Sequence, residues 1–494
     1  DDRPDPDGAH LLGGGRARPG GPAAPGDLEI TEEWDTALTS ADPLAFPDYA
    51  PPAVGDESVR TGVAVVGGHR VAVIECLFDV QGGSMGAVAG ERIVRAFARA
   101  TDQRLPVIEC VASGGARLQE GMIALIQMAR TSSAAAGHAR AGLMSAAVLR
   151  APTTGGVYAS WASLADVRAA EPGAVIGFGG PRVVAEVTGQ WPPRDSHTAE
   201  SAYRHGLVDA LVSPDDQARW LTAAVGLAEA GPLGLPPGRP SRPSPRRAGP
   251  SAPYELLLRA RDGARPSGLE WAAWLTSGWV ELRGPDRSVR AALATVAGRR
   301  CVVIAMDRHA TKDAAAKPGP AAFRLAQRAI LLADRLRLPV LTLIDTPGAD
   351  PSPASEADGL AGEIARTLLA MANLRSVSVA LCVGEGGSGG AMALGHADRL
   401  LQLDGAVFSV IGPEAGAAVL YREPARAPEL TSALCITAAD LLRLRVIDAC
   451  VPETIAAVRR AVSLAFDQSR PGDRLARADR ATAAGLNDAA VRAH

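Results

Sequence analysis

The sequence predicts an α/β protein built as two tandem copies of one fold. Three observations support this prediction. Short apolar runs rich in Val and Ile alternate with amphipathic helical segments, which is typical of a buried, largely parallel sheet covered by helices. Motifs of the first half recur in the second half at a nearly constant spacing. Between the copies lies 231–253, whose eight prolines and four arginines favour extended, solvated backbone.

The internal repeat depends on four matches of sequence and position. The matched pairs are Val71–Ile74 with Val302–Ala305, 104–111 with 337–344, Gly155-Gly156 with Gly389-Gly390, and Gly180-Pro181 with Gly412-Pro413. Four matches with almost the same spacing indicate a tandem duplication.

Within each copy the elements follow in one order. A β-branched strand leads to a Gly-rich turn and then to an amphipathic helix, predicted over 91–100 in the first copy and 321–336 in the second. Further strands then end in Gly-rich turns, and the later turn of each copy opens another helix. These turns are 113–116 and 152–156 in the first copy, and 345–349 and 386–390 in the second.

Composition divides the chain into five parts. The N-terminal part is rich in Gly, Pro and charge without periodicity, so we expect it to be disordered or extended. The parts are 1–53, the first domain 54–230, the linker 231–253, the second domain 254–480, and a C-terminal tail 481–494.

Charge and cysteine content exclude several classes of protein. The formal net charge of -3 gives no reason to expect a nucleic-acid partner. The sequence contains no run of about 18 apolar residues, so it predicts no membrane span. The segment 1–30 lacks the basic and apolar regions of a signal peptide. The six cysteines form no C-x-x-C pair and lie mostly in apolar runs, so we expect a cytoplasmic protein without a metal site.

Three familiar motifs are less well supported by the rest of the sequence. Residues 384–389 fit the G-x-G-x-x-G dinucleotide pattern, but this turn comes late in its half, whereas the fingerprint opens such a fold. Asp345–Gly348 resembles a GTPase switch, but neither lysine of the chain follows a glycine in a phosphate-binding loop. Two G-x-S-x-G elbows, around Ser84 and Ser388, suggest a serine hydrolase, but Ser388 lacks well-placed Asp and His partners and those of Ser84 are unplaced.

The better interpretation treats the Gly-rich turns as sources of backbone N–H groups. Where two such turns meet and each opens a helix, several N–H groups point into one cleft and stabilise an oxyanion. Two such pairs suggest two substrates that each develop negative charge on oxygen. The alternative is that the glycines only serve tight turns and close packing. The residues are Gly114, Gly115, Gly155 and Gly156 in the first half, and Gly348, Ala349, Gly389 and Gly390 in the second.

Long contiguous motifs carry a family resemblance over most of 65–450. The first half, with FDVQGGSMGAVAGERIVRA and ASGGARLQEG, is similar to the β subunit of the bacterial acetyl-CoA carboxylase carboxyltransferase. The second half, with TKDAAAKPGPAAFRLAQRA and VGEGGSGGAMALGHADR, is similar to the α subunit. The chain therefore resembles a fused β/α carboxyltransferase of the crotonase superfamily, which implies two tandem crotonase-like ββα superhelical domains.

The resemblance implies transfer of a carboxyl group from carboxybiotin to the α-carbon of acetyl-CoA or a related acyl-CoA. The first-half turns would hold the thioester oxygen and the second-half turns the biotin carbonyl. Biotin would sit on a separate biotin carboxyl carrier protein, loaded by a separate biotin carboxylase, because the chain has neither a Met-Lys-Met site nor an ATP loop. A homo-oligomer is implied, with sites formed within or between protomers. Alternatives are a crotonase-type CoA-thioester decarboxylase or hydratase, and a non-catalytic scaffold that binds the carrier.

Four charged residues are candidate substrate ligands. Only two of the 51 basic residues are lysines, Lys312 and Lys317, and the resemblance implies that this segment, with Arg324 nearby, meets CoA phosphates or the carrier. Arg117 follows the first Gly-rich turn and is expected either to contact substrate or to orient that turn. The bacterial β subunit begins with a four-cysteine zinc ribbon, but 1–60 contains no cysteine, so no zinc is expected.

Overall fold

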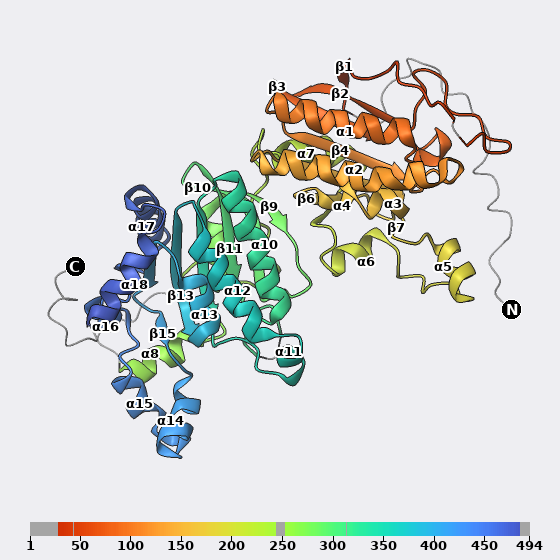
Figure 1. The fold of residues 1–494 in the computed structure, drawn as a ribbon. Coiled ribbons are helices and arrows are strands. Elements are labelled where there is room, and N and C mark those ends of the chain that lie inside the picture. The colour runs from red at the N-terminus through yellow and green to blue at the C-terminus, as the bar shows by residue number, and fades with distance from the viewer. Residues whose placement is uncertain (1–27, 43, 244–251, 313, 485–494) are drawn as a thin grey trace.

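The computed structural model describes residues 28–42, 44–243, 252–312 and 314–484, and each half of the chain forms one sheet with helices around it (Figure 1). The two sheets have the same topology, β1-β2-β3-β4-β5-β6-β8 and β9-β10-β11-β12-β13-β14-β16 in spatial order, with β7 beside β5 and β15 beside β13. The first three strands of each sheet are antiparallel and all later pairs are parallel. The predicted duplication is thus seen strand by strand.

The first half contains β1 (Ile30–Glu33), β2 (Val59–Val66), β3 (His69–Cys76), α1 (Ala87–Asp102), β4 (Val107–Ser113), α2 (Gly121–Arg140), β5 (Ser145–Thr154), α3 (Gly155–Tyr158), α4 (Trp161–Leu164), β6 (Val167–Ala170), β7 (Ile176–Gly177), α5 (Pro181–Thr188), α6 (Ala199–Arg204), β8 (Ala210–Leu211) and α7 (Gln217–Ala224). The second half begins with α8 (Pro253–Ala260) and α9 (Gly268–Leu275). It continues with β9 (Thr276–Leu282), β10 (Val289–Val296), β11 (Arg299–Met306), α10 (Pro320–Leu336), β12 (Val340–Thr346), α11 (Pro353–Ala357), α12 (Leu360–Asn373), β13 (Ser378–Gly387), α13 (Ser388–Gly395), β14 (Arg399–Leu403), β15 (Val407–Ser409), α14 (Pro413–Tyr421), α15 (Ala427–Ala433), α16 (Ala438–Arg443), β16 (Ala449–Val451), α17 (Ile455–Gln468) and α18 (Asp473–Ala484).

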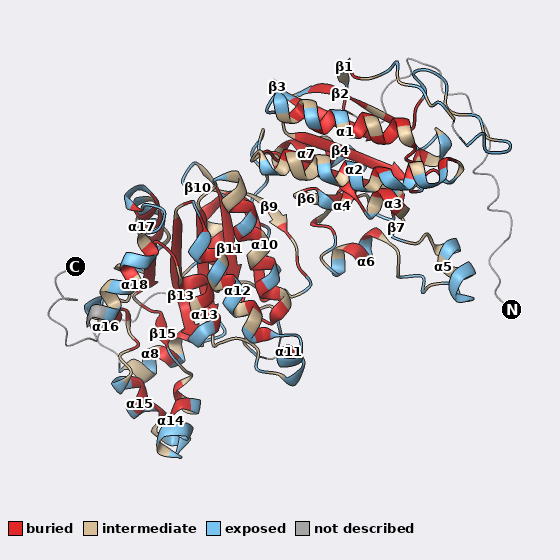
Figure 2. Ribbon diagram, in the orientation of Figure 1, coloured by how far each residue is buried: buried red, intermediate tan, exposed pale blue. Residues whose placement is uncertain are grey.

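Burial explains why these segments take these forms. The central strands are buried on both faces, which is why β4, β12 and β13 read as continuous apolar runs (Figure 2). The two predicted helices are confirmed as α1 and α10, and the predicted face of α10, Phe323 to Ala333, is buried. One apolar cluster joins the halves, because Leu221 of α7 and Val280 of β9 belong to the same core.

Three predicted boundaries differ from the structure. The segment 1–53 is expected to be disordered or extended and to lie outside the first domain, but its described part contains β1, which pairs with β2 of the first sheet, with Leu28 and Trp34 buried beside it. Residues 1–26 lie outside the described residues. Part of the linker is anchored instead of solvated, since Arg239 binds the buried Asp307 at 2.7 Å; residues 244–251 lie outside the description. The boundary at 480 falls inside α18, whose low hydropathy concealed it.

Four of the six cysteines, Cys76, Cys110, Cys301 and Cys382, are buried as expected, and burial raises the pKa of the Cys76 thiol to about 12. Cys435 is half-buried and Cys450 is exposed. No helix in the described ranges combines the length and apolar character needed to cross a membrane. Across the same ranges, no group of three or more His, Cys, Asp or Glu side chains is arranged to hold a metal ion.

Candidate active site

The two first-half turns meet where β4 and β5 end. A Cβ atom on Gly115 would lie 2.9 Å from Cα of Gly155, and one on Gly155 would lie 2.8 Å from Cα of Gly115. Both glycines have positive φ, 111° and 62°, so a side chain would be strained as well as crowded. The structure therefore brings the two predicted turns into direct backbone contact.

Three of the four first-half N–H groups are already used inside the protein. The bonds run from Gly114 to the carbonyl of Gly82 (2.9 Å), from Gly115 to Oγ of Ser113 (3.0 Å) and from Gly155 to the carbonyl of Phe178 (2.9 Å). Gly156 is different because it is the second residue of α3, and the first N–H groups of a helix have no acceptor within it. Of the four first-half glycines predicted to donate an N–H to substrate, Gly156 therefore remains a candidate donor, whereas the other three shape the turns.

Ala116 offers a second amide that the sequence interpretation missed. Met85 pairs with the residues on either side of Ala116. The N–H of Met85 donates to the carbonyl of Gly115, and the carbonyl of Met85 accepts from the N–H of Arg117. The N–H of Ala116 therefore points to the other side of the chain. A Cβ atom on Gly156 would lie 3.5 Å from Cβ of Ala116, which makes the two residues neighbours. The internal repeat could have revealed Ala116, since its counterpart in the second half, Ala349, was already a candidate.

The second-half turns also meet. A Cβ atom on Gly390 would lie 2.6 Å from the amide nitrogen of Ala349. The N–H of Gly348 donates to Oγ1 of Thr346 at 3.1 Å, which repeats the bond from Gly115 to Ser113. Gly389 and Gly390 are the second and third residues of α13, so their N–H groups have no acceptor within that helix.

The structure shifts the alignment of the two halves by one position at this turn. Strands β5 and β13 end at Thr154 and Gly387, so α3 and α13 begin at equivalent positions in the register that aligns 104–111 with 337–344. The expected pairing of Gly155-Gly156 with Gly389-Gly390 is therefore wrong, because Gly156 corresponds to Gly389. Ser388 takes the place of Gly155 and shares its positive φ, at 53°. The match of the two glycine dipeptides was misleading, because Gly156 and Gly389 are equivalent whereas Gly155 corresponds to Ser388.

A cavity of about 410 Å³ opens beside the start of α13. Its walls are mostly apolar, with a few hydroxyl and backbone groups, which is the usual character of a small-molecule site. The lining residues are Ser388, Gly389, Met392, Phe408, Ser409, Val410, Leu434, Leu441 and Val446. Gly389 faces open space, since a Cβ atom there would meet nothing within 4 Å.

A buried group of charges lies behind the second-half turn. Asp345 near the end of β12 accepts the N–H of Glu385 at 3.1 Å and lies 3.7 Å from Nη1 of Arg308. Arg261 in turn binds Glu385 at 2.8 Å. Burial raises the pKa of Asp345 to about 7, despite the opposing effect of Arg308. The sequence interpretation missed this group because its members lie far apart along the chain.

Arg117 is not placed to bind substrate. Its side chain is 0% exposed and binds Glu57 and Glu120, the latter at 3.0 Å. It also donates to the hydroxyl of Ser58 and to both the carbonyl and the hydroxyl of Ser84. All of its N–H groups are therefore engaged within the protein, which supports the alternative role of orienting the turn.

The remaining candidates lie on the second half. Lys312 and Lys317 are both exposed on the loop between β11 and α10. Arg324 on α10 instead binds Asp358 at 2.8 Å and Glu363 at 3.0 Å, so it joins α10 to the α11–α12 region. The lysines stay candidates for an anionic ligand, whereas Arg324 is already paired.

Two family models match the chain, one in each half. Residues 39–225 match the carboxyl transferase domain, and residues 252–486 match the acetyl co-enzyme A carboxylase carboxyltransferase-like family. The acetyl-coenzyme A carboxylase carboxyl transferase subunits beta/alpha of Salinispora arenicola are 44% identical over 418 residues, which cover 80% of this chain and 73% of the relative. This chain belongs to the carboxyltransferase family of acyl-CoA carboxylases.

Other carboxyltransferases extend the comparison. A Mycobacterium tuberculosis protein named "Probable biotin-dependent acyl-coenzyme A carboxylase beta3 subunit" is 40% identical, over 81% of this chain and 80% of its own length. Among solved structures, the hexameric transcarboxylase 12S, with methylmalonyl-coenzyme A and methylmalonic acid bound, has a TM-score of 0.72 and 22% identity over 90% of this chain and 89% of its own. A single-chain long-chain acyl-CoA carboxylase gives a TM-score of 0.68 at 20% identity, and this chain covers 44% of it.

These findings confirm the predicted family and the two-domain crotonase-like fold. They support an acyl-CoA carboxylase carboxyltransferase over the decarboxylase, hydratase and scaffold alternatives.

Proposed function

We propose that this carboxyltransferase moves a carboxyl group from carboxybiotin, carried on a separate protein, to the α-carbon of acetyl-CoA or a related acyl-CoA. With acetyl-CoA the product is malonyl-CoA. The observation that carries the proposal is that two Gly-rich turns meet in each half, Gly115 against Gly155 and Ala349 against Gly390, each beside helix-start amides. Two such sites suit a reaction in which negative charge develops on two different oxygens.

In the first half, the amides of Ala116 and Gly156 would hold the thioester oxygen while the α-carbon carries negative charge. Each such donor is worth about 2.7–4 kcal/mol in the transition state, because it is already oriented before charge develops. No side-chain base is needed on this chain if the biotin ring takes the α-proton as it gives up the carboxyl group.

In the second half, the amides of Ala349 and Gly389 would hold the ureido oxygen of biotin. The cavity beside α13 supports this assignment, since apolar walls such as Met392 and Phe408 suit a hydrophobic ring and its linker. The exposed lysines, Lys312 and Lys317, would meet the CoA phosphates or the carrier protein.

The partners would be a biotin carboxyl carrier protein and a biotin carboxylase in the cytoplasm. Figure 1 shows α3 and α13 well apart, in separate halves of the chain. A site that uses both turn pairs therefore implies at least two copies of the chain, with the first-half turns of one facing the second-half turns of the other.

Substitution of Gly390 by Ala tests the second-half site. The new methyl group would lie 2.6 Å from the amide nitrogen of Ala349, so that amide must move. We expect carboxylation of acetyl-CoA by carboxylated carrier to fall about 100-fold or more, as when one oxyanion donor is lost. Gly412→Ala is the matched control, because a Cβ atom there meets nothing within 4 Å. Full activity of Gly390→Ala, with a folded circular dichroism spectrum, would contradict the assignment.

A further inference from the structure

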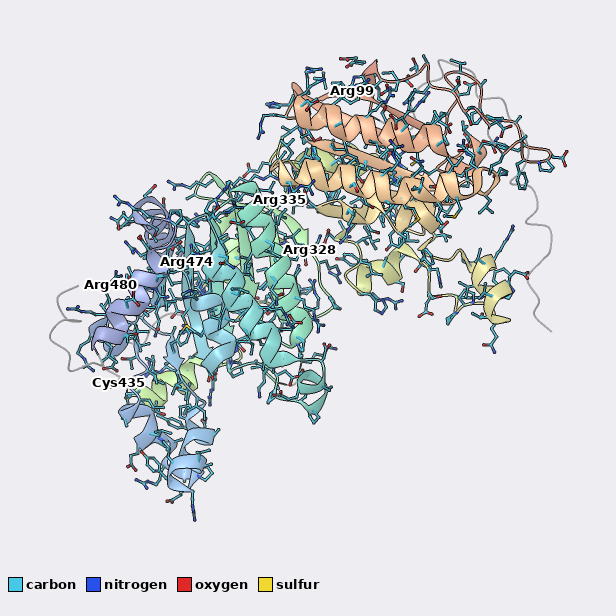
Figure 3. All side chains as sticks on the ribbon, in the orientation of Figure 1. Arg99, Arg328, Arg335, Cys435, Arg474 and Arg480 are labelled. Atoms are coloured by element: carbon cyan, nitrogen blue, oxygen red, sulfur yellow. The ribbon has the colours of Figure 1, made fainter. Side chains whose placement is uncertain are left out.

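Helix α10 joins the two halves through two arginines. Arg328 binds Asp209 with both terminal nitrogens at 2.9 Å, and Arg335 binds Asp166. Figure 3 marks the two arginines. Arg335 also donates to two carbonyl oxygens, those of Ala139 and Leu143. The face of the first half that receives α10 thus consists of two aspartates and the carbonyls at the end of α2.

The second half carries the same face. Asp398 accepts the N–H of Ser378 at 2.8 Å, as Asp166 accepts that of Ser145 at 2.9 Å. Asp448 accepts the N–H of Leu400 at 2.8 Å, as Asp209 accepts that of Arg168 at 2.9 Å. Both aspartates are therefore held by the same backbone contacts in both halves, because they were copied with the repeat.

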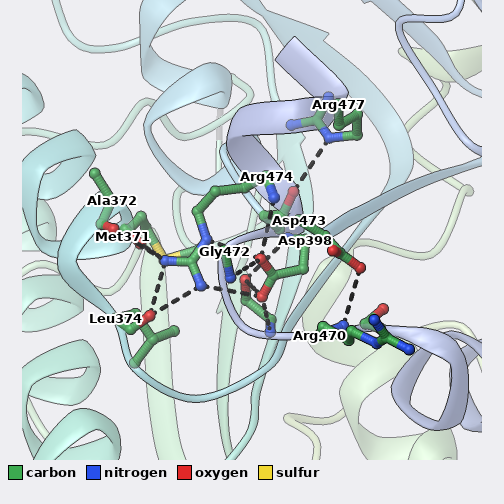
Figure 4. A network of polar contacts seen from close by, with 12 residues as sticks. Met371, Ala372, Leu374, Asp398, Arg470, Gly472, Asp473, Arg474 and Arg477 are labelled. Carbon is green, nitrogen blue, oxygen red and sulfur yellow. Dashed lines mark hydrogen bonds and ion pairs between the residues drawn. The ribbon is translucent and has the colours of Figure 1, made fainter. Parts of the chain in front are cut away.

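Helix α18 covers this second face. Arg474 binds Asp398 at 3.0 Å and donates to the carbonyl oxygen of Ala372 at 3.2 Å (Figure 4). It also donates to the carbonyl oxygen of Ser376 at 3.3 Å. In the register that aligns 104–111 with 337–344, these two carbonyls correspond to those of Ala139 and Leu143. Arg474 thus repeats every kind of contact that Arg335 makes in the first half.

Another arginine of α18 completes the likeness, since Arg480 lies 3.5 Å from Asp448 as Arg328 lies against Asp209. The order is reversed along the chain, so α18 runs opposite to α10 on an equivalent surface. Arg474 and Asp398 are 1% and 0% exposed.

In the first half, the surface of α1 that corresponds to the joint-forming face of α10 is altered. In the same register Arg95 of α1 corresponds to Arg328, but Arg95 binds Asp35 at 3.0 Å, and so does Arg99. Asp35 follows β1 where Arg283 follows β9, and Arg283 reaches across the joint to the carbonyl of Tyr203.

A second reversal lies at the end of α1. The counterpart of Arg335 in this register is Asp102, which is exposed. The first-half surface that corresponds to the joint-forming face of the second half therefore has reversed charge at two positions, Asp35 after β1 and Asp102 at the end of α1.

We propose that α18 and these two aspartates are end caps, which stop a second copy of the chain from adding head-to-tail. Tandem repeats expose the joint-forming face of each terminal unit, and such faces require capping. A head-to-tail contact that does not close would produce open chains. The covered face that carries Asp398 and Asp448 fits one occupant, the face of α1 that carries Arg95, from another copy of the chain. Arginine–aspartate pairs of this kind already join the two halves within one chain.

Two variants expose the complementary faces separately. The first deletes 473–494 and uncovers Asp398 and Asp448. The second, Asp35→Arg with Asp102→Arg, gives α1 the charge pattern of the joint-forming helix. We expect each variant alone to keep the wild-type mass in sedimentation velocity, and an equimolar mixture to form a species of at least twice that mass.

The matched controls are the second variant mixed with wild type, and the mixture in which Arg95→Glu is added to the second variant. Neither should associate. A mixture that sediments as its separate components, with both variants folded by circular dichroism, would overturn the proposal. If the deletion does not fold, Arg474→Glu with Arg480→Glu in the full chain releases α18 by repulsion, and the same mixing result then decides.

Discussion

At the scale of single residues, Asp345 connects the candidate site to the core. It lies near the end of β12, just before the Pro347–Ala349 turn, is 1% exposed, and its Oδ2 has no hydrogen-bond partner among the described residues. A Cβ atom on Gly384 would lie 2.2 Å from Oδ1 of Asp345, so the neighbouring strand approaches the carboxyl closely. The carboxyl is therefore packed rather than hydrated, and burial raises its pKa to about 7.

This raised pKa predicts a pH dependence of stability. A carboxyl whose pKa is higher in the folded state contributes stability that is fully present below about pH 4 and is lost as pH rises towards 7. At about 1.4 kcal/mol per pKa unit, the loss is on the order of 4 kcal/mol. We expect Asp345→Asn to remove this decrease in the free energy of unfolding with rising pH, measured by urea unfolding between pH 4 and 8. The exposed Asp358→Asn should keep it, and an unchanged slope in Asp345→Asn would refute the buried-carboxyl account.

At the scale of elements, α18 shows what a helix with little apolar surface can do. Its contacts are mainly the arginine bonds to Asp398 and to main-chain carbonyls, including three bonds from Arg477 to the carbonyls of Ala397, Val446 and Gly395. The helix is thus held by buried polar contacts, and such contacts are sensitive to loss of one partner.

Arg474→Ala should therefore be far more destabilising than Arg480→Ala. The first leaves Asp398 buried and unpaired, at a cost of about 3–5 kcal/mol. The second removes a pair in which the arginine is 40% exposed and 3.5 Å from its partner, at a cost of about 0–1 kcal/mol. Chemical unfolding of the two variants checks this, and equal free energies of unfolding would contradict it.

Much of the fold could be predicted because apolar periodicity and repetition encode it directly. Continuous Val and Ile runs predicted β4 and β12, and the amphipathic pattern predicted α10. Helix α18 could not be predicted in this way, since its partners are aspartates and carbonyls distant in sequence. The site was predicted as turns but not as amides, because only the structure shows that Ser113 and Thr346 already bind the N–H groups of Gly115 and Gly348.

At the scale of the whole molecule, duplication explains the chemistry and the architecture together. One ancestral unit with a turn pair would stabilise one oxyanion, and its copy would supply a second site, beside which the cavity around Met392 and Phe408 lies. The same duplication created the Arg328–Asp209 joint between the halves. The two-substrate reaction and the two-domain fold thus have a common origin.

The central claim is that this chain carboxylates an acyl-CoA with carboxybiotin as the donor. The most direct measurement incubates the full chain with carboxylated biotin carrier protein, free of ATP and biotin carboxylase, and a panel of acyl-CoAs of increasing chain length. We predict that at least one acyl-CoA gains a carboxyl group in a one-to-one ratio with carrier decarboxylation, and that Gly390→Ala abolishes the gain. Loss of the carboxyl group as free CO2, with no carboxylated acyl-CoA from any member of the panel, would contradict the account.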